Sequence, residues 1–302
     1  MGTRTGTRVT RRIFLGTAAC CMAAPSSNRL SITARIAEAP GSNRKTILGF
    51  EDLVHLAKKV GYGGLDMRAS QAGIQTPPAR LRQMRGVLDS AGIKVSMVTG
   101  DFDVPSNNDN APNGLRHITP YLDLAAGLGA DLIRIGMKKD DDIVWAQRAC
   151  DEARERNIRL AHQSHQMTLF ETVDGSVDTL KRVNRPNFGI IYEAGNWMAC
   201  GQDYGPKTIA RVRPWLMNVY IQNYHLSPAG KTKMQTWTRG TVALDLIGSW
   251  DPGGVDYPQV FKALDAVAFA GYITAFGAFS VFATPEEAAE RSYRYLKPLV
   301  EN

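Results

Sequence analysis

Cysteine is scarce in this sequence, and its placement excludes several kinds of site. The chain contains four cysteines in 302 residues, and two of them, Cys20 and Cys21, are adjacent near the N-terminus. Neither Cys150 nor Cys200 has another cysteine at the C-x-x-C spacing that zinc knuckles and redox pairs use. We expect two buried thiols at these positions, and a single long-range disulfide between them is the alternative in an exported protein.

Glycine motifs for phosphate binding and basic surface stripes are also missing. No G-x-G-x-x-G follows the first expected strand and no G-x-x-x-x-G-K-[ST] occurs, so the dinucleotide and P-loop sites lack their phosphate cradles. The formal net charge is +7, but the first 24 residues hold four arginines and no acidic residue. Without those arginines the charge is +3, and no stripe of Lys and Arg with interleaved aromatic residues appears. The sequence therefore predicts no nucleic-acid partner.

No apolar run near the N-terminus is long enough to cross a membrane. Arg11 and Arg12 precede a short apolar stretch that ends in small residues before Pro25. A membrane-spanning helix needs roughly 20 apolar residues, so we expect no membrane span. The paired arginines are similar to the twin-arginine export signal of bacteria. Residues 1–24 are therefore predicted to be a signal peptide, and the protein is predicted to be periplasmic or secreted.

Two other interpretations of this segment stay open. The first is a basic N-terminal arm on a cytosolic protein. The second is lipid anchoring, because Thr17-Ala-Ala-Cys20 resembles a lipoprotein cleavage site, although Thr17 stands where leucine is usual. Lipid anchoring is the minor alternative.

Helix, glycine and strand patterns alternate along the rest of the chain. Leu53 and Ala57, for example, follow helical spacing and lead to Gly61. Candidate strands begin near residues 30, 64, 93, 131, 157, 188, 216 and 272. Parallel strands need crossovers, and eight such units favour a closed (β/α)8 TIM barrel over an open sheet. We assign residues 25–47 to the first strand and loop, and residues 48–300 to the rest of a single-domain barrel.

Three apolar runs end in polar side chains, and this pattern is the main indication of a site. The polar residues are His162, Gln163, Ser164 and His165, then Glu193 and Asn196, then Gln222, Asn223, Tyr224 and His225. The carboxyl ends of parallel barrel strands share one face, where such barrels keep their chemistry. We therefore predict that these residues line one site. His162 and His165 alternate faces in a strand, so at most one points into the barrel.

A long connection runs from Leu226 to Val255, between the seventh strand and the next helix. It is rich in Gly, Thr and Trp and contains Trp237, Arg239 and Trp250. Long connections without secondary structure of their own are usually lids or binding loops. We expect this loop to enclose the ligand.

With these elements the chain resembles the sugar phosphate isomerase/epimerase family, the xylose-isomerase-like TIM barrels. The resemblance covers roughly residues 48–300. It rests on Gly61-Tyr-Gly-Gly-Leu-Asp-Met67, Ile158-Arg-Leu-Ala-His-Gln-Ser-His165, Gly254-Val-Asp-Tyr-Pro-Gln-Val-Phe-Lys-Ala-Leu264 and the closing helix Thr284-Pro-Glu-Glu-Ala-Ala-Glu-Arg-Ser-Tyr-Arg-Tyr-Leu296. The resemblance implies an enzyme of sugars, with a divalent cation held by acids and imidazoles from four strand ends.

The cation-ligand positions that the resemblance identifies carry different side chains here. The fifth-strand Glu or His is Gln163, and the His two residues later is His165. The sixth-strand Asp is Glu193, and the His after it is Asn196. Tyr220-Ile-Gln222-Asn223 stands in place of His-x-Lys-Asp, and Phe276-Gly-Ala-Phe-Ser280 replaces the usual Glu of the eighth strand. Hard cations need carboxylate oxygens, so we predict no tightly bound metal; a Mn, Mg, Zn or Co ion held by Glu193 and His165 is the alternative.

Glu193 is the candidate base, because it is a lone acid among amides and burial is expected to raise its pKa. His165 is the second catalytic candidate. Structural roles stay open for both: Glu193 as an acid bonded to loop amides or to Arg159, and His165 as a core or supporting histidine. Asp66 and Arg68, at the end of the second strand, either bind substrate or form a buried ion pair.

The predicted function is that of an exported enzyme acting on a sugar or keto-sugar by proton abstraction next to a carbonyl, through isomerisation, epimerisation or β-elimination. Glu193 is the base, while His165 and the amides stabilise the enediolate. The predicted substrate-binding residues are Gln163, Asn196, Trp197, Tyr220, Gln222, Asn223, Trp237 and Arg239. The alternative is a non-catalytic barrel that binds a small-molecule carbohydrate and has lost the metal site. The pattern favours no particular oligomeric state.

Overall fold

The computed structural model describes residues 1–2, 29–39, 45–100, 112–276 and 284–301. The predicted signal peptide lies outside these residues, apart from Met1 and Gly2, and so does the stretch that follows Phe276. Within the described part of the chain, no helix has both the length and the apolar character that crossing a membrane requires.

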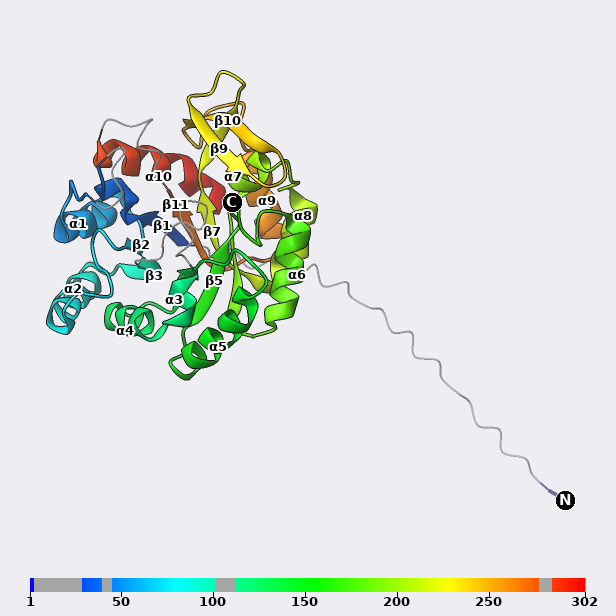
Figure 1. Cartoon of the computed structure of the whole chain (residues 1–302), viewed down its shortest axis with the longest axis horizontal. Helices are drawn as coiled ribbons and strands as arrows, with labels where there is room; N and C mark the ends of the chain where they lie inside the picture. The colour runs from blue at the N-terminus through cyan, green and yellow to red at the C-terminus, as the bar shows by residue number, and fades with distance from the viewer. Residues whose placement is uncertain (3–28, 40–44, 101–111, 277–283, 302) are drawn as a thin grey trace.

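Eight parallel strands close into a barrel (Figure 1). They follow chain order around the barrel, and β11 pairs with β1 to close it. The strands are β1 (Arg29–Thr33), β2 (Gly64–Arg68), β3 (Lys94–Gly100), β4 (Leu132–Ile135), β5 (Arg159–Gln163), β6 (Phe188–Tyr192), β7 (Leu216–Ile221) and β11 (Tyr272–Ala275). Each predicted strand has its counterpart, so the (β/α)8 TIM barrel is confirmed.

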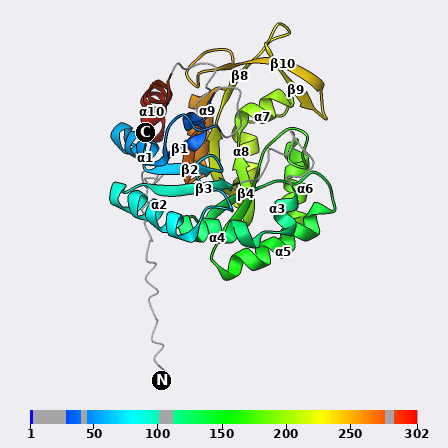
Figure 2. The ribbon, with the colours of Figure 1, turned by 60° about the vertical axis from the view of Figure 1, so that its left-hand side comes forward.

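Helices surround the barrel and connect its strands (Figures 1 and 2). They are α1 (Phe50–Val60), α2 (Pro78–Ala91), α3 (Asn113–Arg116), α4 (Thr119–Leu128), α5 (Asp142–Glu155), α6 (Val173–Val183), α7 (Ala194–Ala199), α8 (Pro206–Val212), α9 (Tyr257–Ala266) and α10 (Pro285–Glu301). Two short 3-10 helices, η1 (Ala34–Ala37) and η2 (Arg213–Trp215), flank β1 and β7. Gly61 ends α1 with a φ of 110°, in the left-handed region that glycine tolerates best.

The long connection after β7 is a small antiparallel sheet, which corrects the loop that we expected there. It consists of β8 (Asn223–Leu226), β9 (Thr232–Thr236) and β10 (Gly240–Ile247), with β10 in the centre. Both ribbon views show it outside the barrel, next to α7 (Figures 1 and 2). It packs there through a cluster of Ala199, Tyr224 and Leu244. Alternating side chains along β10, from Val242 to Leu244, contribute buried residues, as strand geometry requires.

Side chains fill the inside of the barrel in layers. Met97, Leu132, Ala161, Ile191 and Tyr220, from five neighbouring strands, form an apolar cluster separate from the core under the helices. Side chains on a strand alternate faces, so residues two positions further on point inward as well, one layer closer to the carboxyl ends. Those residues are Thr99, Arg134, Gln163, Glu193 and Gln222. We call the space around them, together with Asp66 and Tyr220, the barrel mouth.

Cys150 and Cys200 are both buried and neither forms a disulfide. Burial raises the pKa of each thiol to about 12, so both stay protonated at neutral pH. Of the two alternatives that the sequence left open, the structure has the pair of buried thiols.

Candidate functional site

Glu193 is one of two fully buried acids of the barrel mouth. It follows β6, precedes α7 and is 0% exposed. Gln163 Nε2 donates a hydrogen bond to its Oε2, and the Tyr224 hydroxyl lies 3.5 Å from its Oε1. Burial raises the pKa of the carboxyl to about 8, although Arg134, Gln163 and Tyr224 each lower it. The raised pKa agrees with the sequence-based expectation, and it makes Glu193 largely protonated at pH 7.

A closed ring of hydrogen bonds holds this carboxyl in place. The Tyr224 hydroxyl donates to Asn196 Oδ1 at 3.2 Å, and Asn196 Nδ2 donates to the Ser164 carbonyl at 2.9 Å. The Glu193 amide donates to Ser164 Oγ at 2.8 Å, and this hydroxyl reaches the Glu193 carbonyl at 3.1 Å. The Tyr224 hydroxyl has one proton, so a protonated Glu193 can donate to its oxygen while the hydroxyl donates to Asn196. The side-chain partners of the Glu193 carboxyl are therefore an amide and a tyrosine. Arg159, the other partner considered for it, pairs instead with Asp131 at 2.9 Å.

Asp66 is a second buried acid on the opposite side of the barrel mouth. Its Oδ2 accepts hydrogen bonds from Thr33 Oγ1 at 2.8 Å and from the Tyr220 hydroxyl at 2.9 Å. Its Oδ1 has no hydrogen-bond partner among the described residues. Burial raises its pKa to about 6, against the lowering effect of Arg68, the two hydroxyls and Arg134. Asp66 is therefore mostly ionised at pH 7.

Arg68 does not form the ion pair with Asp66 that was one of our alternatives. Its Nε instead donates to Glu38 Oε1 at 2.8 Å. Arg35 Nη1 lies 3.2 Å from the other oxygen of the same carboxylate, so Glu38 has a guanidinium on each oxygen. Glu38, which no sequence pattern had marked, is 0% exposed.

Arg134 is the residue of the barrel mouth that the sequence reasoning missed. It is 8% exposed on β4. Its charge lowers the pKa of Glu193, Asp66 and His165, so it lies within electrostatic reach of all three. The signal was present in the sequence, because Leu132-Ile-Arg-Ile135 places one charged residue in the middle of a short apolar strand.

His162, in β5, and His165, two residues after its end, take different positions. The His162 ring stacks on Phe170, with ring centroids 4.2 Å apart, and so faces the helices. His165 Nδ1 donates to the Gln166 carbonyl at 3.0 Å, and its ring is 7% exposed. Burial lowers the pKa of both imidazoles to about 3, and Arg134 lowers both further. Both rings are therefore neutral at any physiological pH.

Gln222 and Asn223 have unequal roles. Gln222 is half-buried, and its side chain forms no hydrogen bond with the described residues, so its amide is not engaged by them. The Asn223 amide is occupied: Nδ2 donates to the Gly248 carbonyl at 3.1 Å, and Oδ1 accepts from the backbone of Tyr224 and Val255. Asn223 thus fixes the start of the small sheet, which does not fit the ligand contact predicted for it.

Three further predicted contacts lie away from the barrel mouth. Trp197 is 0% exposed, packs edge-on against Tyr192, and its Nε1 donates to the Phe170 carbonyl at 3.2 Å. Trp237 lies in the turn between β9 and β10 with its side chain exposed, and Arg239 reaches the Ala199 carbonyl at 3.3 Å. The sequence-based prediction placed Trp197 against a ligand, because an apolar indole suits the protein core as well as the face of a sugar ring.

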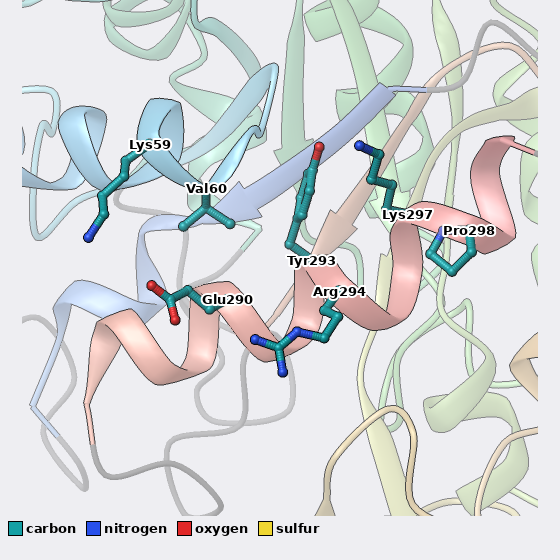
Figure 3. Close-up of a pocket in the computed structure, with 7 residues that line it drawn as sticks. All are labelled: Lys59, Val60, Glu290, Tyr293, Arg294, Lys297 and Pro298. Atoms are coloured by element: carbon teal, nitrogen blue, oxygen red, sulfur yellow. The ribbon is translucent and has the colours of Figure 1, made fainter.

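Two grooves on the described surface lie at the end of the barrel opposite the barrel mouth. One is lined by Lys59, Val60, Glu290, Tyr293, Arg294, Lys297 and Pro298 (Figure 3). A neighbouring one includes Arg29, the first residue of β1, and Gly63, which directly precedes β2. These grooves lie opposite the carboxyl ends, where TIM barrels carry their chemistry, and we do not connect them with Glu193.

The sequence profile of the xylose isomerase-like TIM barrels matches residues 54–299, and the chain belongs to this family. No match is found among curated proteins. The family resemblance that the motifs indicated is thus confirmed over most of the chain.

Solved structures with the same fold have low sequence identity to this chain. A probable 3-DHS dehydratase from Bacillus anthracis has a TM-score of 0.69 at 16% identity, over 89% of this chain and 98% of that one. A xylose isomerase-like TIM barrel protein from Mycobacterium smegmatis, in complex with magnesium, has a TM-score of 0.65 at 16% identity, over 90% and 96%. D-allulose 3-epimerase from Methylomonas sp., in complex with D-allulose, has a TM-score of 0.63 at 16% identity, over 92% and 99%. At this identity the likeness establishes the fold alone.

The side chains of the barrel mouth do not fit a divalent cation of the kind that one of these structures contains. No three His, Cys, Asp or Glu side chains gather as possible ligands in the described part of the chain. Glu193 has Gln163 and Tyr224 on its two oxygens. Arg134 places a permanent positive charge in the same space, which opposes a second cation.

Proposed function

We propose that the protein is an exported enzyme that acts on a sugar or keto-sugar by proton transfer next to a carbonyl, without a tightly bound metal. The observation that carries the proposal is the Glu193 carboxyl, buried in the barrel mouth with a pKa raised to about 8. Groups that transfer protons work best when their pKa lies near the working pH. The membership of the chain in a family with sugar epimerases among its structural neighbours supports a carbohydrate as ligand.

Two buried acids with separated pKa values suit this chemistry. Asp66, with a pKa of about 6, is mostly ionised at pH 7, whereas Glu193, with a pKa of about 8, is mostly protonated. A carboxylate removes the proton from the carbon next to the carbonyl, and the C–H electron pair moves to form the enediolate. Glu193 acts as base in its ionised fraction, about one-tenth at pH 7, and as acid in the remainder. The Gln222 amide, which has no partner among the described residues, donates to the enediolate oxygen. The single proton of neutral His165 is donated to the Gln166 carbonyl, so its Nε2 serves as an acceptor for a hydroxyl of the ligand.

Solvent exchange is the direct test of this proposal. In D₂O, proton abstraction replaces the hydrogen next to the carbonyl by deuterium, which proton NMR detects for each keto-sugar of a panel. We expect exchange with the wild type and a loss of at least 100-fold in Glu193→Gln, because the amide cannot accept and return the proton. Glu290→Gln, an exposed substitution on α10, is the matched control. Exchange that persists in Glu193→Gln would contradict the role of this carboxyl.

A non-catalytic carbohydrate-binding barrel is the second candidate. It is favoured by the contacts that engage both Glu193 oxygens within the protein, from Gln163 to Oε2 and from Tyr224 to Oε1. This candidate predicts that a sugar raises the melting temperature while the wild type exchanges no hydrogen of that sugar.

A further inference from the structure

Arg134 is a buried guanidinium that has no directly bonded partner in the described part of the chain. It is 8% exposed, and it forms no hydrogen bond or ion pair with any residue that the structure describes. A guanidinium carries five N–H donors and stays charged at any physiological pH. Burying such a group without a counter-charge is unfavourable, so a barrel that keeps it there has a use for it.

The acids of the barrel mouth do not neutralise this group directly. Asp66 Oδ2 takes the Thr33 and Tyr220 hydroxyls, and the Glu193 oxygens take Gln163 and Tyr224.

Two partly buried guanidinium groups, on Arg35 and Arg68, share the Glu38 carboxylate. Arg134 is therefore the guanidinium of this region without a directly bonded carboxylate among the described residues, and Tyr220, Glu193 and Asp66 are its electrostatic neighbours.

We propose that Arg134 binds the carboxylate of an acidic sugar, such as an aldonate or a uronate. This inference rests on the proposed function, since it concerns the ligand of the same barrel mouth. The planar fork of a guanidinium donates two parallel hydrogen bonds to a carboxylate. Asp66 Oδ1, which is buried and unpartnered among the described residues, is an acceptor for a hydroxyl of the same ligand.

A single negative charge suits this arrangement better than the two charges of a phosphate. Asp66 and Glu193 already bring two acids within electrostatic reach of Arg134, and a dianion would be repelled by both whenever they are ionised. A neutral sugar, in turn, leaves the guanidinium donors without a charged partner in direct contact. The expected ligand therefore carries one carboxylate among several hydroxyls.

Binding measurements that need no turnover test the inference separately from the proposed function. The probes are D-gluconate and D-galacturonate, each compared by calorimetry with its neutral counterpart, D-glucose or D-galactose, with the methyl ester of the same acid and with glucose 6-phosphate. We expect at least one acid to bind wild-type protein about 10- to 100-fold more tightly than its neutral counterpart and its ester. Arg134→Gln is expected to abolish that preference, and Arg134→Lys to keep part of it, because lysine has the charge without the fork.

Matched controls separate the possible failures. Arg159→Gln removes an exposed arginine that pairs with Asp131, and it is expected to leave the preference for the acid unchanged. Glu193→Gln is expected to bind the acid while exchanging no hydrogen. If Arg134→Gln does not fold, the comparison of acid and ester in the wild type still decides the matter. Equal affinity for acid and ester, preference for the phosphate, or no binding of either acid would overturn the inference, whatever the outcome of the exchange assay.

Discussion

Glu193 makes the stability of the protein depend on pH in a way that one substitution can isolate. Its carboxyl has an ordinary pKa of 4.5 and a pKa of about 8 in the folded protein. Below pH 4.5 it is protonated in both the folded and the unfolded chain, and it contributes no pH dependence. Between these two values the unfolded chain releases the proton and the folded chain keeps it, so stability is lost as pH rises. Above pH 8 both states are ionised and the loss is complete.

The magnitude follows from the size of the pKa difference. A difference of about 3.5 pH units corresponds to about 5 kcal/mol, at 1.36 kcal/mol for each unit. Between pH 5.0 and pH 8.5 about 4 kcal/mol of this is expressed, because both ends of the range lie within a unit of the two pKa values. Glu193 is completely buried, so no solvent screening reduces the figure. Glu193→Gln keeps the shape of the side chain and removes the titration.

The assay is urea unfolding of the wild type and of Glu193→Gln at pH 5.0, 7.0 and 8.5, followed by circular dichroism. We expect the free energy of unfolding of the wild type to fall relative to the variant by about 4 kcal/mol across this range. Other groups, including Asp66, titrate in both proteins and cancel in the difference. Glu290→Gln should follow the wild type at every pH. Parallel profiles for wild type and Glu193→Gln would show that Glu193 titrates near its ordinary pKa, and the acid-base role built on it would lose its basis.

Three other expectations concern Arg134, bound metal and Glu171. Arg134→Met should raise the melting temperature of the ligand-free protein by about 2–6 °C, because it removes an unpaired buried charge; a lower melting temperature would show that the guanidinium has a partner. Metal analysis by inductively coupled plasma should find well below one Mn, Zn or Co per chain, and EDTA should leave the melting temperature unchanged; stoichiometric metal would contradict the fit of the side chains. Glu171→Gln should cost about 2 kcal/mol, because this carboxylate accepts backbone hydrogen bonds from Met167, Trp237 and Thr238, and proteolysis should then cut first between β9 and β10. Cleavage elsewhere would show that Glu171 does not hold the turn.

The barrel could be predicted from the sequence because its signals are local and repeated. Gly61, for example, directly follows a helical pattern and ends α1 in the left-handed conformation that glycine tolerates best. Glu193 could be found for a similar reason, because it directly follows a buried strand. The environment of Glu193 could not be predicted, because the Tyr224 hydroxyl reaches the carboxyl only through the fold of the small sheet.

The missed and misplaced residues show where local patterns stop being informative. Arg134 was visible as a charge within an apolar strand, but its lack of a partner depends on residues from several other strands. Trp197 and Asn223 follow strand ends as Glu193 does, yet one turns into the core and the other binds backbone groups. The direction in which a side chain leaves a strand end is set by the loop that follows, and long-range packing determines that loop.

Tyr224 belongs to two structures at once. It is a residue of β8, where it packs on α7, and its hydroxyl completes the ring around Glu193. Shortening or replacing the small sheet after β7 would therefore change the surroundings of the Glu193 carboxyl. An engineered replacement would need a phenol hydroxyl at the position of the Tyr224 hydroxyl, because without it Glu193 would bind its proton with a different affinity.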